Sequence, residues 1–284
     1  MSITQVQAND IPQRVVSMNL CTDQLALMLA KTGQLKAVTW MAQDPSMSVM
    51  AEQARQLPAH RGTAEEVYSL SSDLVLTGTY TNQATLDMLK HLGRRVVAIP
   101  PAFSFADIRK NMQQVGDVLG QSVLAAELVA AFDKHLSRVK ISSDKKNILD
   151  SKRLSATSYG ANLYMQGANS LEKDMVESAG FAHYGTQSQL GDYGGRVSLE
   201  QLVMSPPDVL LMSNYQQHEV RAYQHLVHPA LDKLVPARQR ADTQPRNWTC
   251  GTPLVLETVA KLAELRKKLE GGNNMDVVDE AVRQ

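Results

Sequence analysis

Two segments of the 284-residue chain match each other at a fixed offset of 135 residues. Residues 61–80 read RGTAEEVYSLSSDLVLTGTY, and residues 196–215 read RVSLEQLVMSPPDVLLMSNY. Each segment predicts a helix with an acidic first turn, an Asp before a buried strand, and a polar loop ending in Tyr. Four pairs agree in register: Arg61 with Arg196, Glu65 with Glu200, Asp73 with Asp208, and Tyr80 with Tyr215. The repeat predicts two lobes built on the same plan.

Short apolar runs alternate with helical segments through both halves. In the first half, strands are predicted at 14–18, 36–40, 73–77 and 95–99, with helices at 22–31 and 84–92; Thr22 or Asp23 would cap the first helix. In the second half, strands are predicted at 153–159 and 209–212, with helices at 171–178, 198–204, 229–234 and 253–269. Buried strands separated by helices indicate parallel sheets covered on both faces. The expected fold class is α/β, with two Rossmann-like lobes.

Residues 105–139 form the longest helical segment, with apolar residues spaced three and four apart along one stripe. Gly116 and Gly120 weaken it, so a kink or a two-part helix stays open. We therefore expect an N-terminal lobe at 11–104, a single long spacer helix at 105–140, a C-terminal lobe at 150–270 and a tail at 271–284.

Composition excludes several classes of function. Lys plus Arg (29) balances Asp plus Glu (29), and no basic arm occurs, so we expect no nucleic-acid partner. No run approaches the roughly 18 apolar residues that span a bilayer. Residues 1–10 lack the apolar core of a secretory leader, which fits either a cytosolic protein or an exported one whose leader is absent from this sequence. The common catalytic motifs are missing, so we expect no enzyme.

Loops at the carboxyl ends of parallel strands form the ligand crevice in open α/β sheets. Only 5% of the chain is aromatic, yet many aromatic residues fall in these predicted loops, and they suit a large planar or chelated ligand. Arg61 and Arg196 could pair with anionic groups of such a ligand, or simply with the Glu one helical turn later. The candidate ligand-binding residues are Met18, Asn19, Trp40, Arg61, Tyr80, Tyr159, Tyr164, Tyr193, Arg196, Tyr215 and Trp248.

The two cysteines, Cys21 and Cys250, both lie in predicted crevice loops. They are either unrelated thiols or one long-range disulfide that would tie the lobes together, provided that their Cα atoms come within about 7 Å. The seven His residues are scattered, so we expect no bound metal ion of the protein's own, although His183 stays open as an axial ligand to a chelated metal.

Four stretches together resemble the class III periplasmic substrate-binding proteins of ABC importers for cobalamin, haem and ferric siderophores. They are RVVSMNLCTDQLALML, GTAEEVYSLSSDLVLTG, DVLGQSVLAAELVAAF and VSLEQLVMSPPDVLL, and the resemblance covers about residues 11–270. It implies a periplasmic monomer without a cofactor, which captures a bulky metal chelate (a ferric siderophore or a corrinoid) between its lobes and delivers it to an ABC permease. In that family an acidic residue on each lobe docks onto arginines of the permease; Glu65 and Glu200 match, with Glu66 competing for the first position.

Two alternatives stay open at this point. The first is a haem-binding protein of the same type. The second is a cytosolic sensor or chaperone for a metallocofactor, built on the same bilobal fold.

Overall fold

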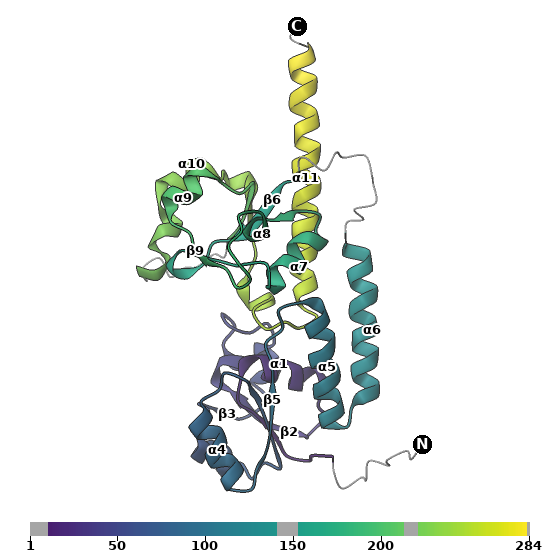
Figure 1. Cartoon of the computed structure of the whole chain (residues 1–284). Coiled ribbons are helices and arrows are strands. Elements are labelled where there is room, and N and C mark those ends of the chain that lie inside the picture. Colours follow the sequence, from purple (N-terminus) through teal and green to yellow (C-terminus); the bar gives the residue numbers. More distant parts are fainter. Residues whose placement is uncertain (1–10, 141–152, 213–220, 283–284) are drawn as a thin grey trace. The chain divides into compact units, whose positions relative to one another are not determined.

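A computed structural model describes residues 11–140, 153–212 and 221–282 (Figure 1). Internal contacts divide the chain into two compact units. Unit 1 is Met1–Asp133 with Thr249–Pro253, and unit 2 is Lys134–Trp248 with Leu254–Gln284. Residues 249–253 belong to unit 1, whereas the sequence predicts them in the second lobe.

Unit 1 is built on a five-stranded parallel sheet in the order β3-β2-β1-β4-β5. Its strands are β1 (Val15–Ser17), β2 (Leu35–Thr39), β3 (Ala59–His60), β4 (Leu74–Gly78) and β5 (Arg95–Ile99). The connections contain α1 (Leu20–Leu29), η2 (Trp40–Gln43), α2 (Ala51–Ala54), α3 (Ala64–Ser69) and α4 (Gln83–His91). The four predicted strands of this lobe are confirmed, whereas β3 is only two residues long and carries no apolar run. The order of the strands reverses beside β1, which is where α/β sheets of this kind hold ligands.

Helix α1 begins earlier than predicted, because Asn19 rather than Thr22 or Asp23 is its N-cap. The Asn19 side-chain oxygen accepts a hydrogen bond from the backbone N–H of Cys21 at 2.9 Å. The Thr22 hydroxyl instead donates to the Asn19 carbonyl oxygen, and Asp23 is buried beneath the helix. Thr22 and Asp23, which were predicted as caps, are therefore both buried within unit 1, and neither caps the helix.

The segment predicted as one long spacer helix consists of two, α5 (Phe105–Leu119) and α6 (Ser122–Val139), which run antiparallel in Figure 1. Gly120 ends α5 in the left-handed conformation (φ 69°), which glycine adopts at little cost. Gly116 lets the two helices pack closely, since a Cβ atom there would lie 2.3 Å from Cβ of Ala125. The single continuous helix is therefore corrected to a hairpin, and the boundary between the two units falls within α6.

Unit 2 contains a four-stranded parallel sheet in the order β11-β10-β6-β8 and a separate antiparallel pair, β7 with β9. Its strands are β6 (Ser155–Ser158), β7 (Tyr164–Met165), β8 (Ala182–His183), β9 (Gly195–Arg196), β10 (Val209–Met212) and β11 (Arg240–Asp242). Its α-helices are α7 (Leu171–Ser178), α8 (Tyr184–Gln187), α9 (Leu199–Met204), α10 (Pro229–Leu234) and α11 (Val255–Val282), and its 3-10 turns are η3 (Ala161–Leu163), η4 (Arg221–Val227), η5 (Ala237–Gln239) and η6 (Pro245–Asn247).

Helix α11 extends beyond its predicted end at residue 269, through the predicted tail, to Val282. Its first half is held by buried residues at helical spacing, namely Leu256, Val259, Leu262 and Ala263. Gly271 and Gly272 each disfavour a helix by about 1 kcal/mol relative to Ala, but no proline blocks its continuation. The tail from residue 271 is therefore corrected to helix as far as Val282.

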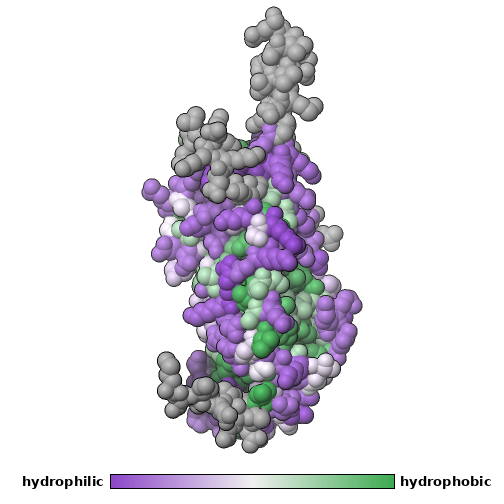
Figure 2. Space-filling view, turned by 90° about the vertical axis from the view of Figure 1, so that its right-hand side faces the viewer, coloured by the Kyte–Doolittle hydropathy of each residue, from purple (hydrophilic) through white to green (hydrophobic). Residues whose placement is uncertain are grey.

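No helix within the described part of the chain is long and apolar enough to cross a membrane. On the face drawn in Figure 2, hydrophilic residues surround a group of hydrophobic ones in the lower half of the view.

Candidate functional site

The carboxyl ends of the parallel strands in unit 1 place the predicted ligand-binding residues of the first lobe on one edge of the sheet. Asn19 follows β1, Trp40 follows β2, Arg61 follows β3, and the loop with Tyr80 follows β4. The side chains of Trp40, Arg61 and Tyr80 are exposed, and Tyr80 most of all (85%). Met18 is different, because it is buried in the core with Val16 and Val75. We call Asn19, Trp40, Arg61 and Tyr80 the unit 1 edge.

A buried polar layer lies directly under this edge. The carboxylate of Asp23 accepts hydrogen bonds from the hydroxyl (2.5 Å) and the backbone N–H (3.2 Å) of Thr39, the last residue of β2. Its other oxygen has no partner among the described residues. Burial raises the pKa of Asp23 to about 7, against the opposing effect of the Thr39 hydrogen bonds. The sequence indicates Asp23 only as a helix cap, because no local pattern distinguishes a buried Asp from a capping one.

His60 fixes the loop that carries Arg61. The backbone N–H of Gly62 donates to Nδ1 of His60 at 3.0 Å, so the other ring nitrogen, Nε2, donates to the carbonyl oxygen of Ser17 at 2.8 Å. Burial lowers the pKa of His60, which keeps the ring neutral. Gly62 adopts φ 84°, so the turn after β3 depends on glycine.

A disulfide joins Cys21 to Cys250, with 4.7 Å between their Cα atoms. The long-range alternative is therefore what the structure contains, and both cysteines belong to unit 1. The disulfide holds residues 249–253 against α1, at the end of the helix that carries Asn19. The same segment packs tightly against the loop after β5, since a Cβ atom on Gly251 would lie 2.4 Å from Cβ of Ala102.

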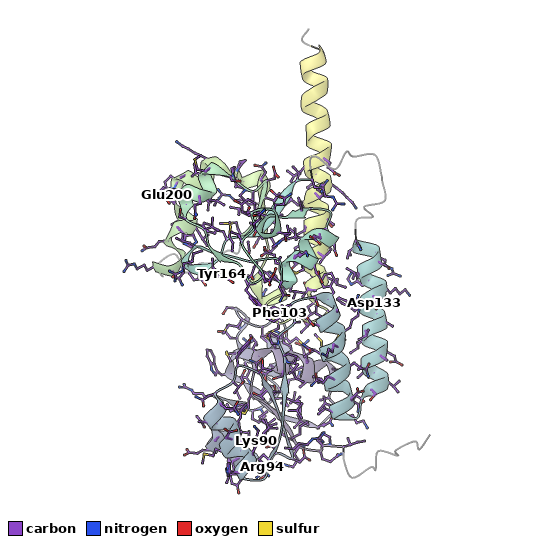
Figure 3. The ribbon with its side chains drawn as sticks, viewed as in Figure 1. Lys90, Arg94, Phe103, Asp133, Tyr164 and Glu200 are labelled. Carbon is purple, nitrogen blue, oxygen red and sulfur yellow. A yellow bond between two sulfur atoms is a disulfide. The ribbon has the colours of Figure 1, made fainter. Side chains whose placement is uncertain are left out.

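In unit 2 two of the predicted ligand-binding residues, Tyr164 and Arg196, lie on the antiparallel pair of β7 and β9, and a third, Tyr193, lies just before β9. Tyr164 and Arg196 are directly opposite each other in the register, and the Tyr164 hydroxyl donates to the carbonyl oxygen of Tyr193. Tyr164 and Tyr193 are exposed. Figure 3 shows Tyr164 at a different place in unit 2 from Glu200.

Arg196 also lines a pocket of about 470 Å³ in unit 2, together with Ser155, the first residue of β6, and Tyr184 and Ser205. Ser155 marks the amino end of the unit 2 sheet, whereas ligand crevices form at the carboxyl end. Arg196 therefore lies beside a pocket at the amino end of the unit 2 sheet, and not at the carboxyl end that the sequence predicts.

Tyr159 does not have the position that the sequence predicts. It is buried (3% exposed) in the core of unit 2, its hydroxyl donates to the carbonyl oxygen of Val197 at 2.7 Å, and its ring packs edge-on against His225. Burial raises its pKa to about 12. It follows β6 directly and packs inward with Leu210 and Leu231, so its role is in the core. Trp248 is half-buried, and Tyr215 lies outside the described residues.

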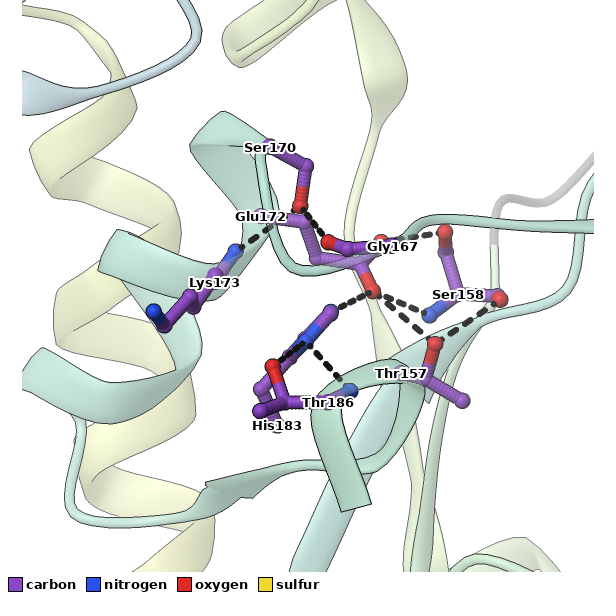
Figure 4. Close-up of polar contacts among 8 residues, drawn as sticks. All are labelled: Thr157, Ser158, Gly167, Ser170, Glu172, Lys173, His183 and Thr186. Atoms are coloured by element: carbon purple, nitrogen blue, oxygen red, sulfur yellow. Dashed lines mark hydrogen bonds and ion pairs between the residues drawn. The ribbon is translucent and has the colours of Figure 1, made fainter. Parts of the chain in front are cut away.

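Glu172 and His183 form a buried polar network at the carboxyl end of β6 (Figure 4). The Glu172 carboxylate accepts hydrogen bonds from the Thr157 hydroxyl, from the backbone N–H and hydroxyl of Ser158, and from Nε2 of His183. The backbone N–H of Thr186 donates to Nδ1 of His183. Both ring nitrogens are therefore occupied and the side chain is fully buried, so His183 is not an available axial ligand. Within the described ranges, no three His, Cys, Asp or Glu side chains converge in a way that could hold a metal ion.

The two candidate docking residues occupy matching positions in equivalent helices. In α3, Thr63 and Glu66 form a reciprocal capping box: the backbone N–H of Glu66 donates to the Thr63 hydroxyl, and the Glu66 carboxylate accepts from the backbone N–H of Thr63. In α9, Ser198 and Gln201 do the same, at an offset of 135 residues.

The two capping boxes set the same helical phase at both sites. Glu65 and Glu200 therefore occupy the second position of their helices, and both side chains are exposed. The Glu66 carboxylate is engaged by the backbone N–H groups of Arg61 and Thr63, which hold its pKa below the usual range. Of the two competing residues, Glu65 is the one at the position that matches Glu200, and its side chain makes no hydrogen bond or ion pair with another described residue.

The chain belongs to the periplasmic binding protein family, which matches residues 15–240. No curated protein matches it in sequence. Solved structures with the same fold include the periplasmic heme-binding protein RhuT from Roseiflexus sp. RS-1 in its apo form, at 19% identity and a TM-score of 0.72, covering 89% of this chain and 97% of that one.

Two further structures extend this likeness. The periplasmic vitamin B12 binding protein BtuF of Vibrio cholerae has 16% identity and a TM-score of 0.67, covering 91% of this chain and 98% of its own. An ABC-type Fe3+-hydroxamate transport system protein from Saccharomonospora viridis has 18% identity and a TM-score of 0.66, covering 90% and 93%. The resemblance seen in the sequence is thus confirmed at the level of the family and the fold.

Proposed function

We propose that this protein is the extracytoplasmic ligand-binding component of an ABC uptake system, which captures a bulky metal chelate and delivers it to the permease. The family match over residues 15–240 is the observation that carries the proposal. The solved proteins with this fold include a heme-binding protein, a vitamin B12 binding protein and a protein of an Fe3+-hydroxamate transport system. We assign it a role in binding rather than in catalysis.

The disulfide favours an extracytoplasmic location over the cytosolic sensor. Structural disulfides persist in oxidising compartments and are rare in the cytosol, where thiols are kept reduced. Cys250 is 5% exposed, and its bond to Cys21 fastens a chain segment that is otherwise remote in sequence. A cytosolic protein of this fold would have to form that bond against the reducing conditions around it.

The chemistry of the unit 1 edge supports a chelate as cargo. Trp40 and Tyr80 offer flat apolar surface with a polar rim, and Arg61 supplies a guanidinium for carboxylate, phosphate or catecholate groups. Tyr164 and Tyr193 offer a similar surface in unit 2. A ferric siderophore or a corrinoid presents both features, a bulky ring system and acidic or polar substituents. Haem, which carries two carboxylates on a planar ring, is the second candidate.

Ligand identity is tested by titrating the purified protein with haem, cobalamin and ferric hydroxamate and catecholate chelates, following tryptophan fluorescence. Trp40 lies on the unit 1 edge, so a true ligand should quench it strongly, and a Trp40→Phe variant should lose part of that response. Saturable quenching by one of these chelates supports the proposal. Absence of a response to all of them would point to another small molecule.

Delivery is tested with the double substitution Glu65→Ala and Glu200→Ala. Both side chains are exposed and lie outside the unit 1 edge, so chelate affinity should stay intact while uptake in a transport assay falls strongly. The matched control is Glu66→Gln, which keeps the capping box through its amide oxygen and should transport normally. Loss of chelate affinity in the double variant would count against docking through these residues.

A further inference from the structure

We call α3 and α9, which carry Glu65 and Glu200, the docking helices. They also share an exposed apolar residue. Tyr68 lies three residues after Glu65, and Val203 lies three residues after Glu200, so each apolar side chain shares a helix face with the carboxylate. Tyr68 and Val203 are themselves related by the 135-residue offset, and they are exposed to nearly the same extent, 43% and 44%. Tyr68 and Val203 are therefore equivalent in their position along the helix, in the helix face on which they lie, and in their exposure.

The opposite sides of both helices are firmly packed, so Tyr68 and Val203 are not exposed because their helices pack poorly. Val67 in α3 and Leu202 in α9, again 135 residues apart, are completely buried, and they anchor their helices in the cores of unit 1 and unit 2. With one side of each helix fixed in this way, the side that carries the Glu and the apolar residue faces outward. Met204, the last residue of α9, adds to the apolar surface of unit 2 and is 85% exposed.

Tyr68 is held in place on the surface of unit 1. The guanidinium of Arg94 lies over its ring, 4.6 Å from the centroid, and Nη1 of Arg94 donates to the carbonyl oxygen of Ser72 at 2.9 Å. Figure 3 shows Arg94 beside Lys90 at the end of α4. An aromatic side chain that is already ordered loses little conformational entropy when a partner covers it. This is a property of contact residues at protein interfaces, where Tyr is enriched.

We propose that Tyr68 on α3, and Val203 with Met204 on α9, are the apolar anchors of the permease contact, and that they supply most of its stability while Glu65 and Glu200 guide association. This inference rests on the proposed function. The duplication of a carboxylate beside an apolar residue fits a partner with two equivalent surfaces, each with a basic residue next to an apolar socket. The division of roles follows from general interface energetics: buried apolar anchors govern dissociation, and exposed charges mainly govern association.

The test measures binding kinetics of the intact protein to its cognate ABC importer, purified in lipid nanodiscs. Val203→Ser and Tyr68→Ser should each raise the dissociation rate about tenfold, with little change in the association rate. Glu65→Gln and Glu200→Gln should instead lower the association rate and weaken its dependence on salt. Val123→Ser is the matched control, because Val123 is an equally simple exposed valine (75%) on α6, outside both docking helices. It should bind like the wild type.

The possible outcomes distinguish failure of the proposed function from failure of the apolar anchors. If the wild-type protein does not bind the importer, the proposed function fails. If it binds and the Glu variants associate more slowly, but the Ser variants dissociate at the wild-type rate, the proposed function stands and the anchors are refuted. If Tyr68→Ser fails to fold because the Arg94 contact is lost, Val203→Ser and Met204→Ser, which involve no such contact, still decide the question. Tyr68→Phe keeps the ring and should retain slow dissociation.

Discussion

The carboxylate of Asp208 accepts hydrogen bonds from the backbone N–H (2.7 Å) and the hydroxyl (2.9 Å) of Ser155, the residue that begins β6. Asp73 occupies the matching place in unit 1, where it accepts from the backbone N–H groups of Gln13 and Arg14 just before β1. In both units an Asp at the start of one strand thus binds the start of the neighbouring first strand. The pairing of Asp73 with Asp208 in the sequence repeat reflects a shared structural role.

Asp208→Ala should destabilise the protein, because it leaves the N–H and hydroxyl of buried Ser155 without this acceptor. The expected loss in the free energy of unfolding is about 1–3 kcal/mol. Asp73→Ala should cost less, about 1 kcal/mol, because Gln13, Arg14 and Asp73 are exposed and water can replace the lost acceptor. Denaturant unfolding measures both, with Asp192→Ala, an exposed residue, as the control. Wild-type stability of both Asp variants would mean that these contacts contribute nothing.

Most helices and strands could be predicted because short stretches of sequence are enough to indicate them. Buried parallel strands such as β4 carry continuous apolar runs, and the capped helices α3 and α9 carry their signal within a few residues. What escaped prediction depends on contacts between distant residues. β3 and β9 are two residues long, and the hairpin of α5 and α6 depends on the approach of Gly116 to Ala125 as well as on the turn at Gly120.

The candidate site was predicted less completely, for the same reason. The sequence placed Trp40 and Tyr80 after strands, and the structure brings them to one sheet edge. It could not tell an outward tyrosine from an inward one, so Tyr159, which belongs to the core, was grouped with them. Nor could it assign residues 249–253 to unit 1, because the disulfide that fastens them spans 229 residues of sequence.

Removal of the disulfide should destabilise unit 1. Replacing both cysteines, as Cys21→Ser with Cys250→Ser, should lower the free energy of unfolding by roughly 2–5 kcal/mol, because the unfolded chain regains the freedom that the cross-link removes. The internal control is a reducing agent: dithiothreitol should lower the stability of the wild type towards that of the double variant and leave the variant unchanged. If the wild type and the double variant had the same stability with and without dithiothreitol, the disulfide would have no stabilising role.

The buried carboxyl of Asp23 should make stability depend on pH. Its pKa is about 7 in the folded protein against an ordinary 3.8, so the folded state retains a proton that the unfolded state has released. The contribution of this group is therefore most favourable below about pH 4 and declines as the pH rises to about 7, by at most about 4 kcal/mol. Asp23→Asn, which stays neutral, should gain stability relative to the wild type between pH 5 and 8.

Unfolding at a series of pH values measures this difference, with Asp44→Asn as the control. Asp44 is exposed, and the hydroxyl and backbone N–H of Ser46 hold its pKa below the usual value, so its contribution has the opposite sign and is lost only as the pH falls below about 4. A difference between Asp23→Asn and the wild type that stays constant from pH 5 to 8 would show that Asp23 is ionised throughout.

The last prediction separates the tyrosines that contact ligand from the one that supports the core. Tyr80→Ala removes an exposed aromatic side chain from the unit 1 edge, so the affinity for the chelate found by fluorescence titration should fall about tenfold with stability unchanged. Tyr159→Phe removes the hydrogen bond to Val197, so it should cost about 1 kcal/mol of stability and leave affinity unchanged. Tyr68→Ala controls for loss of an exposed tyrosine away from the edge, and its affinity for the chelate should equal that of the wild type. If Tyr80→Ala bound as tightly as the wild type while Tyr159→Phe bound weakly, the ligand would lie against the core of unit 2 and not on the unit 1 edge.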